Sequence, residues 1–495
     1  MLQTAADYVK QIVGTLSHVL VEGLSRWRQA QDPTAVRAME LEVAALQRET
    51  ADQVAGGTLQ ELARDPALQA RASHVARRQL GLRSGGARTV EVMLLGGSTV
   101  RLKAEYFKPD RRRSKTRRKK RGKGGQGLYP VLAALGIHNG VTAAVAGEVC
   151  AQVADSDSLR AAQAALHRRG LSLGLQRIQR IVNQFSARAV EQRNQWLEQM
   201  RQPASRPGPL AGKRIVVAID GGRLRERVPA RAGRRRQATG HRRYDAPWRE
   251  PKLFTIYVLK ADGTIDERYQ PVYDATLGDC EQMFPMLEGY LKALGAHQAQ
   301  QLVFVADGAK WIWERTQKLV SELGLAAEQV VEVIDWCHAV EVLYDIANER
   351  VGWTQRQRDQ WVSKAKKGLY AGDIQGLLEA IEGLCVGRRA KDIAQHRDYF
   401  ARHAARMQYA RFEQDKVPRG SGCVESAIRR VVNLRMKGNG TFWLEDSAEG
   451  MLLLRSYLKS GHFDTLIDWS LSLAVPWWEF DQRPSAPFSF PMAAS

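Results

Sequence analysis

The stretch KRIVVAIDGG, residues 213–222, decides the fold of the C-terminal part of the chain. Five consecutive apolar residues at 215–219 lead directly into Asp220, and two glycines follow. A short continuous apolar run rich in valine and isoleucine predicts a strand that is buried on both faces, as in an α/β sheet. Ligands bind in the crevice beyond the carboxyl ends of such strands, and glycine lets a ligand approach the backbone closely. The stretch therefore predicts an α/β domain with Asp220 at its binding edge.

Downstream, four more stretches have strand character: LFTIYVLK (253–260), ERYQPVYDAT (267–276), QLVFVADG (301–308) and QVVEVIDW (329–336). Only helical patterns are legible between about 340 and 415, and a glycine-rich break, VPRGSGCVES, then precedes one more helix. We expect an α/β catalytic core over 213–475 that is interrupted by an all-helical insertion at about 340–415.

Upstream of this core the chain is mainly helical, with features typical of DNA-binding regions. Residues 89–106 contain two β-rich runs around a Gly-Gly-Ser turn, which predicts a hairpin. Two segments on either side of Gly170 have helix-turn-helix proportions, with Ser172 as the expected cap of the second helix. The expected regions are 1–86 (helical), 87–125 (β-hairpin and basic arm), 126–200 (helical, helix-turn-helix-like), 201–212 (linker) and 476–495 (irregular tail).

Composition points to a polyanionic partner. The 495-residue chain has 74 basic and 53 acidic residues and a formal net charge of +21. Its five cysteines include no CxxC pair, which argues against a disulfide framework or a zinc ribbon. Nowhere do about 18 apolar residues run together, as a membrane span requires. We expect a cytoplasmic, nucleoid-associated protein without a membrane partner.

Three acids have the placement expected of a metal site. Asp220 and Asp307 each end an apolar strand beside glycine, and Glu425 lies just inside the helix after the PRGSG break. Carboxylates brought together repel one another unless hard cations such as Mg²⁺ or Mn²⁺ neutralise them. Two such ions are the standard apparatus for in-line attack on a phosphodiester. Each acid alone also has a simpler explanation: an Asp-Gly pair at a strand end is often only a turn, and Glu425 is explained as an acid at a helix N-terminus.

Basic residues cluster around these features. The arm 108–123 holds eleven basic side chains and one acid, and the segment 223–243 holds nine arginines and one acid. Both are interpreted as tracking DNA phosphates, with solvated loops as the alternative. The residues expected to bind DNA are Arg111, Arg112, Arg113, Arg117, Arg118, Lys119, Lys120, Arg177, Arg180, Arg223, Arg225, Arg234, Arg235, Arg236, Arg429, Arg430 and Lys437.

Cys337 and His338 follow the fifth predicted strand. Because no further ligands occur at metal spacing, a zinc site or a catalytic thiol is disfavoured there. We interpret His338 as a polar residue near the metals or the scissile phosphate, with a satisfied core histidine as the alternative.

Four blocks resemble a known family: AIDGGRLRER, VADGAKWIW, DWCHAVEVL and GSGCVESAIRRVVNLRMKGNGTFW. Together they look like the DDE transposases of bacterial insertion sequences, and most like the Kra-type group that is related to mutator-like transposases. The resemblance covers roughly residues 85–475. It implies an RNase H-like core, a helical insertion before the glutamate, and metal-binding roles for Asp220, Asp307 and Glu425. The family's DxxH signature falls on Asp335 and His338.

The resemblance implies an enzyme that binds the double-stranded ends of an insertion sequence, cleaves a strand and transfers it to target DNA. Two Mg²⁺ or Mn²⁺ ions would be its cofactors, and a dimer or larger assembly on DNA would hold both ends. An RNase H-like nuclease or resolvase is the enzymatic alternative. A domesticated transposase that acts as a DNA-binding regulator is the non-enzymatic one, although such a protein is expected to lose an acid and all three are present.

Overall fold

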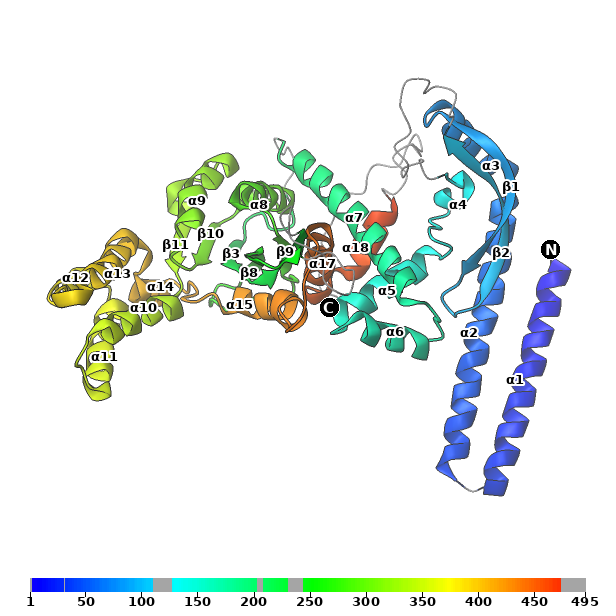
Figure 1. Ribbon diagram of the computed structural model, residues 1–495, viewed down its shortest axis with the longest axis horizontal. Coiled ribbons are helices and arrows are strands. Elements are labelled where there is room, and N and C mark those ends of the chain that lie inside the picture. The colour runs from blue at the N-terminus through cyan, green and yellow to red at the C-terminus, as the bar shows by residue number, and fades with distance from the viewer. Residues whose placement is uncertain (1, 31, 110–126, 203–207, 230–243, 473–495) are drawn as a thin grey trace. The chain divides into compact units, whose positions relative to one another are not determined.

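The computed structural model describes residues 2–30, 32–109, 127–202, 208–229 and 244–472 (Figure 1). They form two compact units: the described residues up to Phe185 together with those from Ile467 onward, and Ser186–Leu466. Within these described ranges, no helix combines the length and apolar character that a membrane crossing needs. The basic residues 111–120 and 234–236, and the predicted irregular tail, lie outside the described residues.

The first unit opens with three helices, within the region that the sequence predicts to be helical: α1 (Leu2–Ala30), α2 (Pro33–Arg64) and α3 (Pro66–Arg78). An aspartate followed by proline begins each of the last two, and Asp32 accepts a hydrogen bond from the Thr34 amide at 3.0 Å. The predicted hairpin is confirmed as β1 (Leu82–Met93) paired antiparallel with β2 (Thr99–Pro109). Asp52 of α2 accepts hydrogen bonds at 2.8 Å from the amides of Gly96 and Ser98, so α2 fixes the hairpin turn.

Four helices follow the hairpin: α4 (Pro130–Ala134), α5 (Ala143–Asp155), α6 (Leu159–Arg168) and α7 (Leu175–Met200). The turn between α6 and α7 uses Gly170 at φ +89° as predicted. The expected capping role of Ser172 was wrong, because α7 begins only at Leu175. Leu171 and Leu173 are both buried, and burying them keeps the chain out of the helix until Gly174. The boundary between the two units falls within α7.

The second unit is built on a five-stranded mixed sheet in the order β11-β10-β3-β8-β9. Its strands match the five predicted stretches: β3 (Arg214–Gly221), β8 (Lys252–Leu259), β9 (Val272–Thr276), β10 (Gln301–Ala306) and β11 (Val330–Ile334). The first three form an antiparallel meander, and β10 and β11 run parallel to β3. The helices α8 (Cys280–Leu294) and α9 (Lys310–Leu323) lie on one face of the sheet, and α15 (Gly422–Ile428) packs against β3 and β8 on the other (Figure 1).

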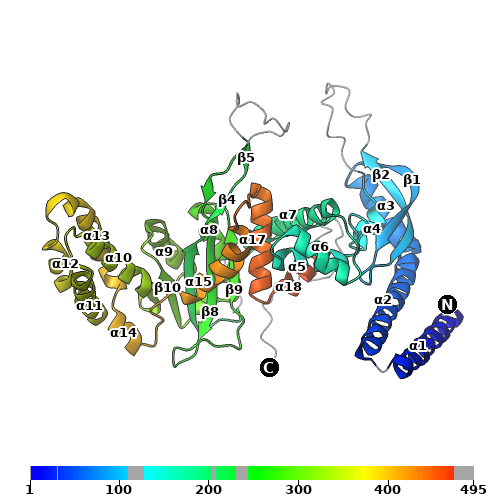
Figure 2. The ribbon, with the colours of Figure 1, turned by 60° about the horizontal axis from the view of Figure 1, so that its bottom comes forward.

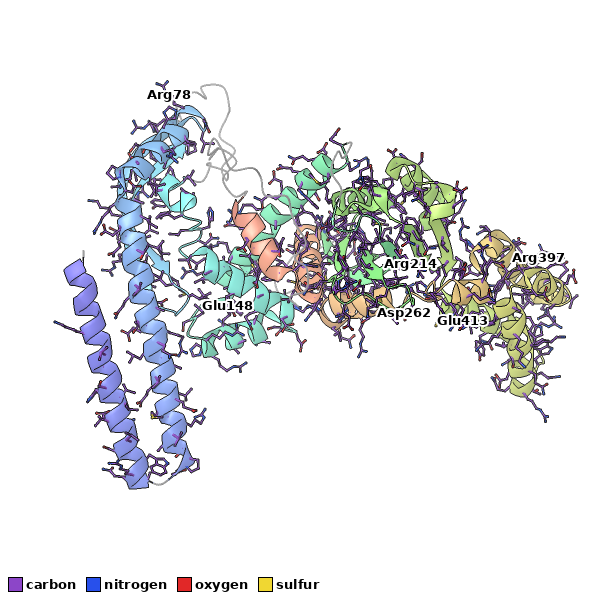
Figure 3. The ribbon with its side chains drawn as sticks, turned by 180° about the vertical axis from the view of Figure 1, so that it is seen from behind. Arg78, Glu148, Arg214, Asp262, Arg397 and Glu413 are labelled. Carbon is purple, nitrogen blue, oxygen red and sulfur yellow. The ribbon has the colours of Figure 1, made fainter. Side chains whose placement is uncertain are left out.

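The predicted helical segment is confirmed. It comprises α10 (Trp336–Glu349), α11 (Gln355–Ala371), α12 (Ile374–Glu382), α13 (Ala390–His403) and α14 (Tyr409–Gln414). Surface ion pairs join its helices. Arg397 of α13, labelled in Figure 3, pairs with Asp398 at 2.7 Å and with Glu382 of α12. Short 3₁₀ turns occur at Ala296–Gln298, Ala327–Gln329, Gly387–Arg389 and Ala404–Arg406.

The helix that follows α15 is not regular. Residues Arg429–Asn433 form a π-helical turn before α16 (Leu434–Met436), α17 (Glu445–Lys459) and α18 (Phe463–Ser472). The buried guanidinium of Arg455 donates to the carbonyl of Val431 at 2.6 Å and also to that of Arg430. A side chain bound to these carbonyls accounts for the wider turn, since the carbonyls no longer serve a regular α-helical ladder.

Candidate active site

Three aspartates lie next to one another at the end of three neighbouring strands. Ile219 of β3 lies opposite Ala306 of β10, and Ala306 lies opposite Ile334 of β11. All three strands are parallel, so the residues that follow these three are adjacent and on the same face. Those residues are Asp220, Asp307 and Asp335. The sheet register alone therefore brings the first two predicted acids together and adds a third one.

Glu425 and His338 reach the same edge from helices. His338 lies in the first turn of α10, directly after β11, and Glu425 lies in the first turn of α15. The possible ligand atoms of Asp335, His338 and Glu425 all lie within 4.8 Å of one another. The imidazole Nδ1 of His338 is also 3.2 Å from Glu341 one turn further along α10. His338 is half-buried and faces the acids.

The electrostatics of Asp220 show that the predicted acids share one environment. Burial, together with the negative charges of Asp307 and Glu425, raises the pKa of Asp220 to about 6. A hydrogen bond from the Gly221 amide and the nearby His338 act in the opposite direction. A buried carboxylate whose pKa is raised by neighbouring acids is typical of a functional site.

Asp335 connects the strand end to the loop before α15. Its side chain is buried and accepts hydrogen bonds from the backbone amide and the hydroxyl of Ser421, the latter at 2.7 Å, and from the amide of His338 at 3.0 Å. The Trp336 amide donates to the Arg419 carbonyl at 2.9 Å. These contacts fix the loop that carries Glu425, so Asp335 positions the site as well as lining it. Sequence reasoning reached Asp335 only through the resemblance and did not single out Ser421.

The helical insertion also reaches the site, through α13. A Cβ atom at Gly308 would overlap the ring of Tyr399, so only glycine fits between Asp307 and this tyrosine. Burial, followed by the charges of Asp307 and Asp335, raises the pKa of Tyr399 well above its usual value. The Tyr399 hydroxyl is buried and has no hydrogen-bond partner among the described residues. No pattern in the sequence marks Tyr399, because its role depends on how the insertion folds back.

Next to Tyr399, His403 is also buried, and burial with the charges of Arg406 and Arg402 lowers its pKa to about 4. His403 is therefore uncharged at physiological pH, and it packs beside Tyr399 at the edge of the site.

The predicted DNA-binding residues fall into three groups. Arg180, Arg223, Arg225, Arg429 and Lys437 are exposed. Two others have partners within the protein: Arg177 donates to the carbonyls of Asn139 and Gly140, and Arg430 donates to the Tyr273 hydroxyl at 2.7 Å. The remaining ones lie outside the described residues: Arg111, Arg112, Arg113, Arg117, Arg118, Lys119, Lys120, Arg234, Arg235 and Arg236.

The donor set fits hard divalent cations. The group of possible ligands consists of the Asp335 and Glu425 carboxylates and the His338 imidazole; Asp220 and Asp307 do not belong to it, although Asp220 interacts electrostatically with Asp307, His338 and Glu425. Oxygen-rich sites of this kind suit Mg²⁺ or Mn²⁺. No protein-family model matches the chain, and neither does any curated protein sequence or solved structure.

Proposed function

We propose that the chain is a DDE transposase, an enzyme that cleaves DNA at the ends of an insertion sequence and transfers the freed strand to target DNA. The observation that carries the proposal is the convergence of Asp220, Asp307 and Glu425, with His338, at one edge of the sheet. A cluster of acids inside a chain of net charge +21 suits an enzyme that attracts DNA and holds cations against it.

The topology supports the same proposal. A three-stranded antiparallel meander followed by two strands parallel to the first is the order that an RNase H-like core requires. The acids follow the first and fourth of these strands, and the glutamate follows a helical insertion, as the resemblance to DDE transposases implies. We assign the RNase H-like fold as part of this proposal.

Asp220, Asp307 and Glu425 would hold two Mg²⁺ or Mn²⁺ ions. When bound, such ions activate the attacking oxygen and stabilise the leaving oxygen of a phosphodiester. Asp335 and Ser421 orient the loop that carries Glu425, and His338 lies where it can contact a phosphate oxygen. The reaction forms one P–O bond to water or to a 3′-hydroxyl as the original P–O bond breaks, and no covalent bond to the protein is needed.

Double-stranded DNA is the proposed partner, both as the ends of the element and as the target. Two ends of the element must be held together for strand transfer, so the proposal includes a dimer or larger assembly on DNA. It also includes a location in the bacterial cytoplasm, at the nucleoid. Exposed Arg180, Arg223, Arg429 and Lys437 are available for phosphate contacts.

A strand-transfer assay tests the proposal. It would use Mg²⁺ and DNA that carries the sequences flanking the gene, and compare the wild type with Asp220→Asn, Asp307→Asn and Glu425→Gln. Each variant should still bind DNA but lose more than roughly 100-fold in cleavage and joining, since even the outer partners of metal ligands typically contribute about 10- to 100-fold. Asp345→Asn, an exposed position on α10, is the matched control and should keep full activity.

The assay also separates the alternatives. Cleavage of branched DNA without joining would favour a nuclease or resolvase. DNA binding by the wild type with no chemistry in Mg²⁺ or Mn²⁺ would favour a DNA-binding regulator. Full activity in the three acid variants would refute the proposed site.

A further inference from the structure

Directly after Asp220 the chain leaves the central sheet and forms two short ribbons. β4 (Leu224–Arg225) pairs with β7 (Trp248–Arg249), and β5 (Val228–Pro229) pairs with β6 (Tyr244–Asp245). Figure 2 shows β4 and β5 extending away from the sheet. Trp443, from the segment that follows α16, joins the ribbon by bridging to Glu226. The ribbons are thus anchored to the β3 end that carries Asp220 and to the chain that follows Glu425.

Three aromatic and two arginine side chains contact one another in a row along these ribbons, with Phe442 contributed by the segment after α16. The Arg225 guanidinium lies 4.8 Å from the ring centroid of Trp248 and 6.0 Å from that of Phe442. Phe442 contacts Tyr244 edge-on, with centroids 5.4 Å apart, and the Arg227 guanidinium lies 4.3 Å from the Tyr244 centroid. We call these five side chains, Trp248, Arg225, Phe442, Tyr244 and Arg227, the stacking row.

Four members of the stacking row are exposed and Phe442 is half-buried, although aromatic rings normally bury their faces. Trp248 is 51% exposed and Tyr244 36%. The ribbons are held together by other groups beneath the row. Arg249 pairs with the buried Glu226 at 2.6 Å, Trp443 donates its indole N–H to the Met436 carbonyl at 3.1 Å, and backbone hydrogen bonds join Trp443 to Arg225 and Arg227. The row itself is therefore free to contact a ligand.

We infer that the stacking row binds unpaired bases of a DNA strand beside the candidate active site. Exposed aromatic rings and planar guanidinium groups stack on the face of any base, and basic side chains next to them contact the strand's phosphates. In an intact duplex the bases stack on one another and offer only their edges, so the row selects frayed or single-stranded DNA. Two acids lie in the ribbons: Glu226 is buried and paired with Arg249, so it does not repel a phosphate, and Asp245 of β6 is half-buried. That the bound strand is also the strand that reacts rests on the proposed function.

Binding is measured in EDTA, so that no metal-dependent chemistry takes part. The full-length protein is titrated into a fluorescein-labelled 12-nucleotide single strand and, separately, into the same strand within a duplex. Trp248→Ala should weaken single-strand binding by about 5- to 150-fold, the usual contribution of stacking on one base, and duplex binding by less than about twofold. Arg225→Lys, which keeps the charge but removes the planar group, should also weaken the single-strand complex selectively.

Trp27→Ala is the matched control, because Trp27 is a similarly exposed tryptophan, 46%, between two arginines in the other unit. It should change neither affinity. An equal loss of single-strand and duplex binding in Trp248→Ala would show a phosphate-contact surface and overturn the inference. Unchanged single-strand binding in both Trp248→Ala and Arg225→Lys would also overturn it. Asp220→Asn should keep single-strand binding, so failure of the proposed chemistry and failure of the stacking row give different results.

Discussion

At the scale of single residues, the proposed metal ligand Asp220 also affects the free energy of unfolding. Its pKa in the folded protein is about 6 rather than 3.8. Between these values the folded chain holds a proton that the unfolded chain has released, so in the absence of divalent metal the free energy of unfolding falls as pH rises from about 4 to 6. Above pH 6 the lost stability amounts to at most about 3 kcal/mol.

Asp220→Asn removes this titration. In EDTA at pH 7.5 the variant should unfold at higher urea concentration than the wild type, and the difference should shrink toward pH 4. Adding Mg²⁺ should stabilise the wild type and have much less effect on the variant, because a ligand that binds only the folded state raises its stability. Asp345→Asn, which is exposed, should behave like the wild type throughout. A variant that is less stable than the wild type in EDTA at pH 7.5 would contradict the raised pKa of the buried Asp220.

At the scale of elements, a buried ion-pair cluster holds the second half of α7 to the sheet and to α17. The Arg193 guanidinium is 1% exposed and lies 3.1 Å from Asp274 of β9 and 2.9 Å from Glu449 of α17. Burial alone lowers the pKa of Arg193, but the two carboxylates more than offset it and keep the guanidinium charged. Asp274 also accepts hydrogen bonds at 2.7 Å from the Tyr290 hydroxyl and the Ala275 amide.

Arg193→Met leaves Asp274 as a buried and unpaired charge, which should cost about 3–5 kcal/mol in urea denaturation. Adding Asp274→Asn should restore part of this loss, because the uncompensated charge disappears. The matched control is Arg411→Met, which breaks a 3.5 Å pair with Asp415 between side chains that are 77% and 53% exposed, and should cost less than about 1 kcal/mol. Similar losses in Arg193→Met and Arg411→Met would mean that the buried cluster does not anchor α7.

The same scale shows what the sequence can and cannot predict. The five sheet strands were predicted because strands buried on both faces are continuous apolar runs, and the register then brings Asp220 and Asp307 together. The π-helical turn at Arg429–Asn433 was missed because a distant side chain, Arg455, causes it. Tyr399 was missed for a similar reason, since only the packing of α13 against Gly308 brings it to the acids. The local pattern of apolar residues is enough to predict which segments form strands. The π-helical turn and the position of Tyr399 depend instead on contacts between residues far apart in the chain.

At the scale of the whole molecule, the charge distribution predicts how the proposed DNA binding responds to salt concentration. The arm 108–123 carries eleven basic residues and one acid, which is about half of the net charge of +21. If its side chains neutralise DNA phosphates, each contact contributes about 0.9 to the slope of log affinity against log salt concentration. Replacing Arg111, Arg112, Arg113, Arg117, Arg118, Lys119 and Lys120 by glutamine should therefore lower that slope by up to about 6 for duplex DNA.

Fluorescence anisotropy between 50 and 200 mM salt measures this slope, with EDTA present to prevent cleavage. Replacing the five arginines of this set by lysine keeps every charge and should leave the slope unchanged, although contacts that need the forked guanidinium would weaken. An unchanged slope in the glutamine variant would show that the arm does not contact phosphates. DNA attraction would then have to come from basic residues of the folded units, such as Arg180, Arg429 and Lys437, and neutralising those would lower the slope instead.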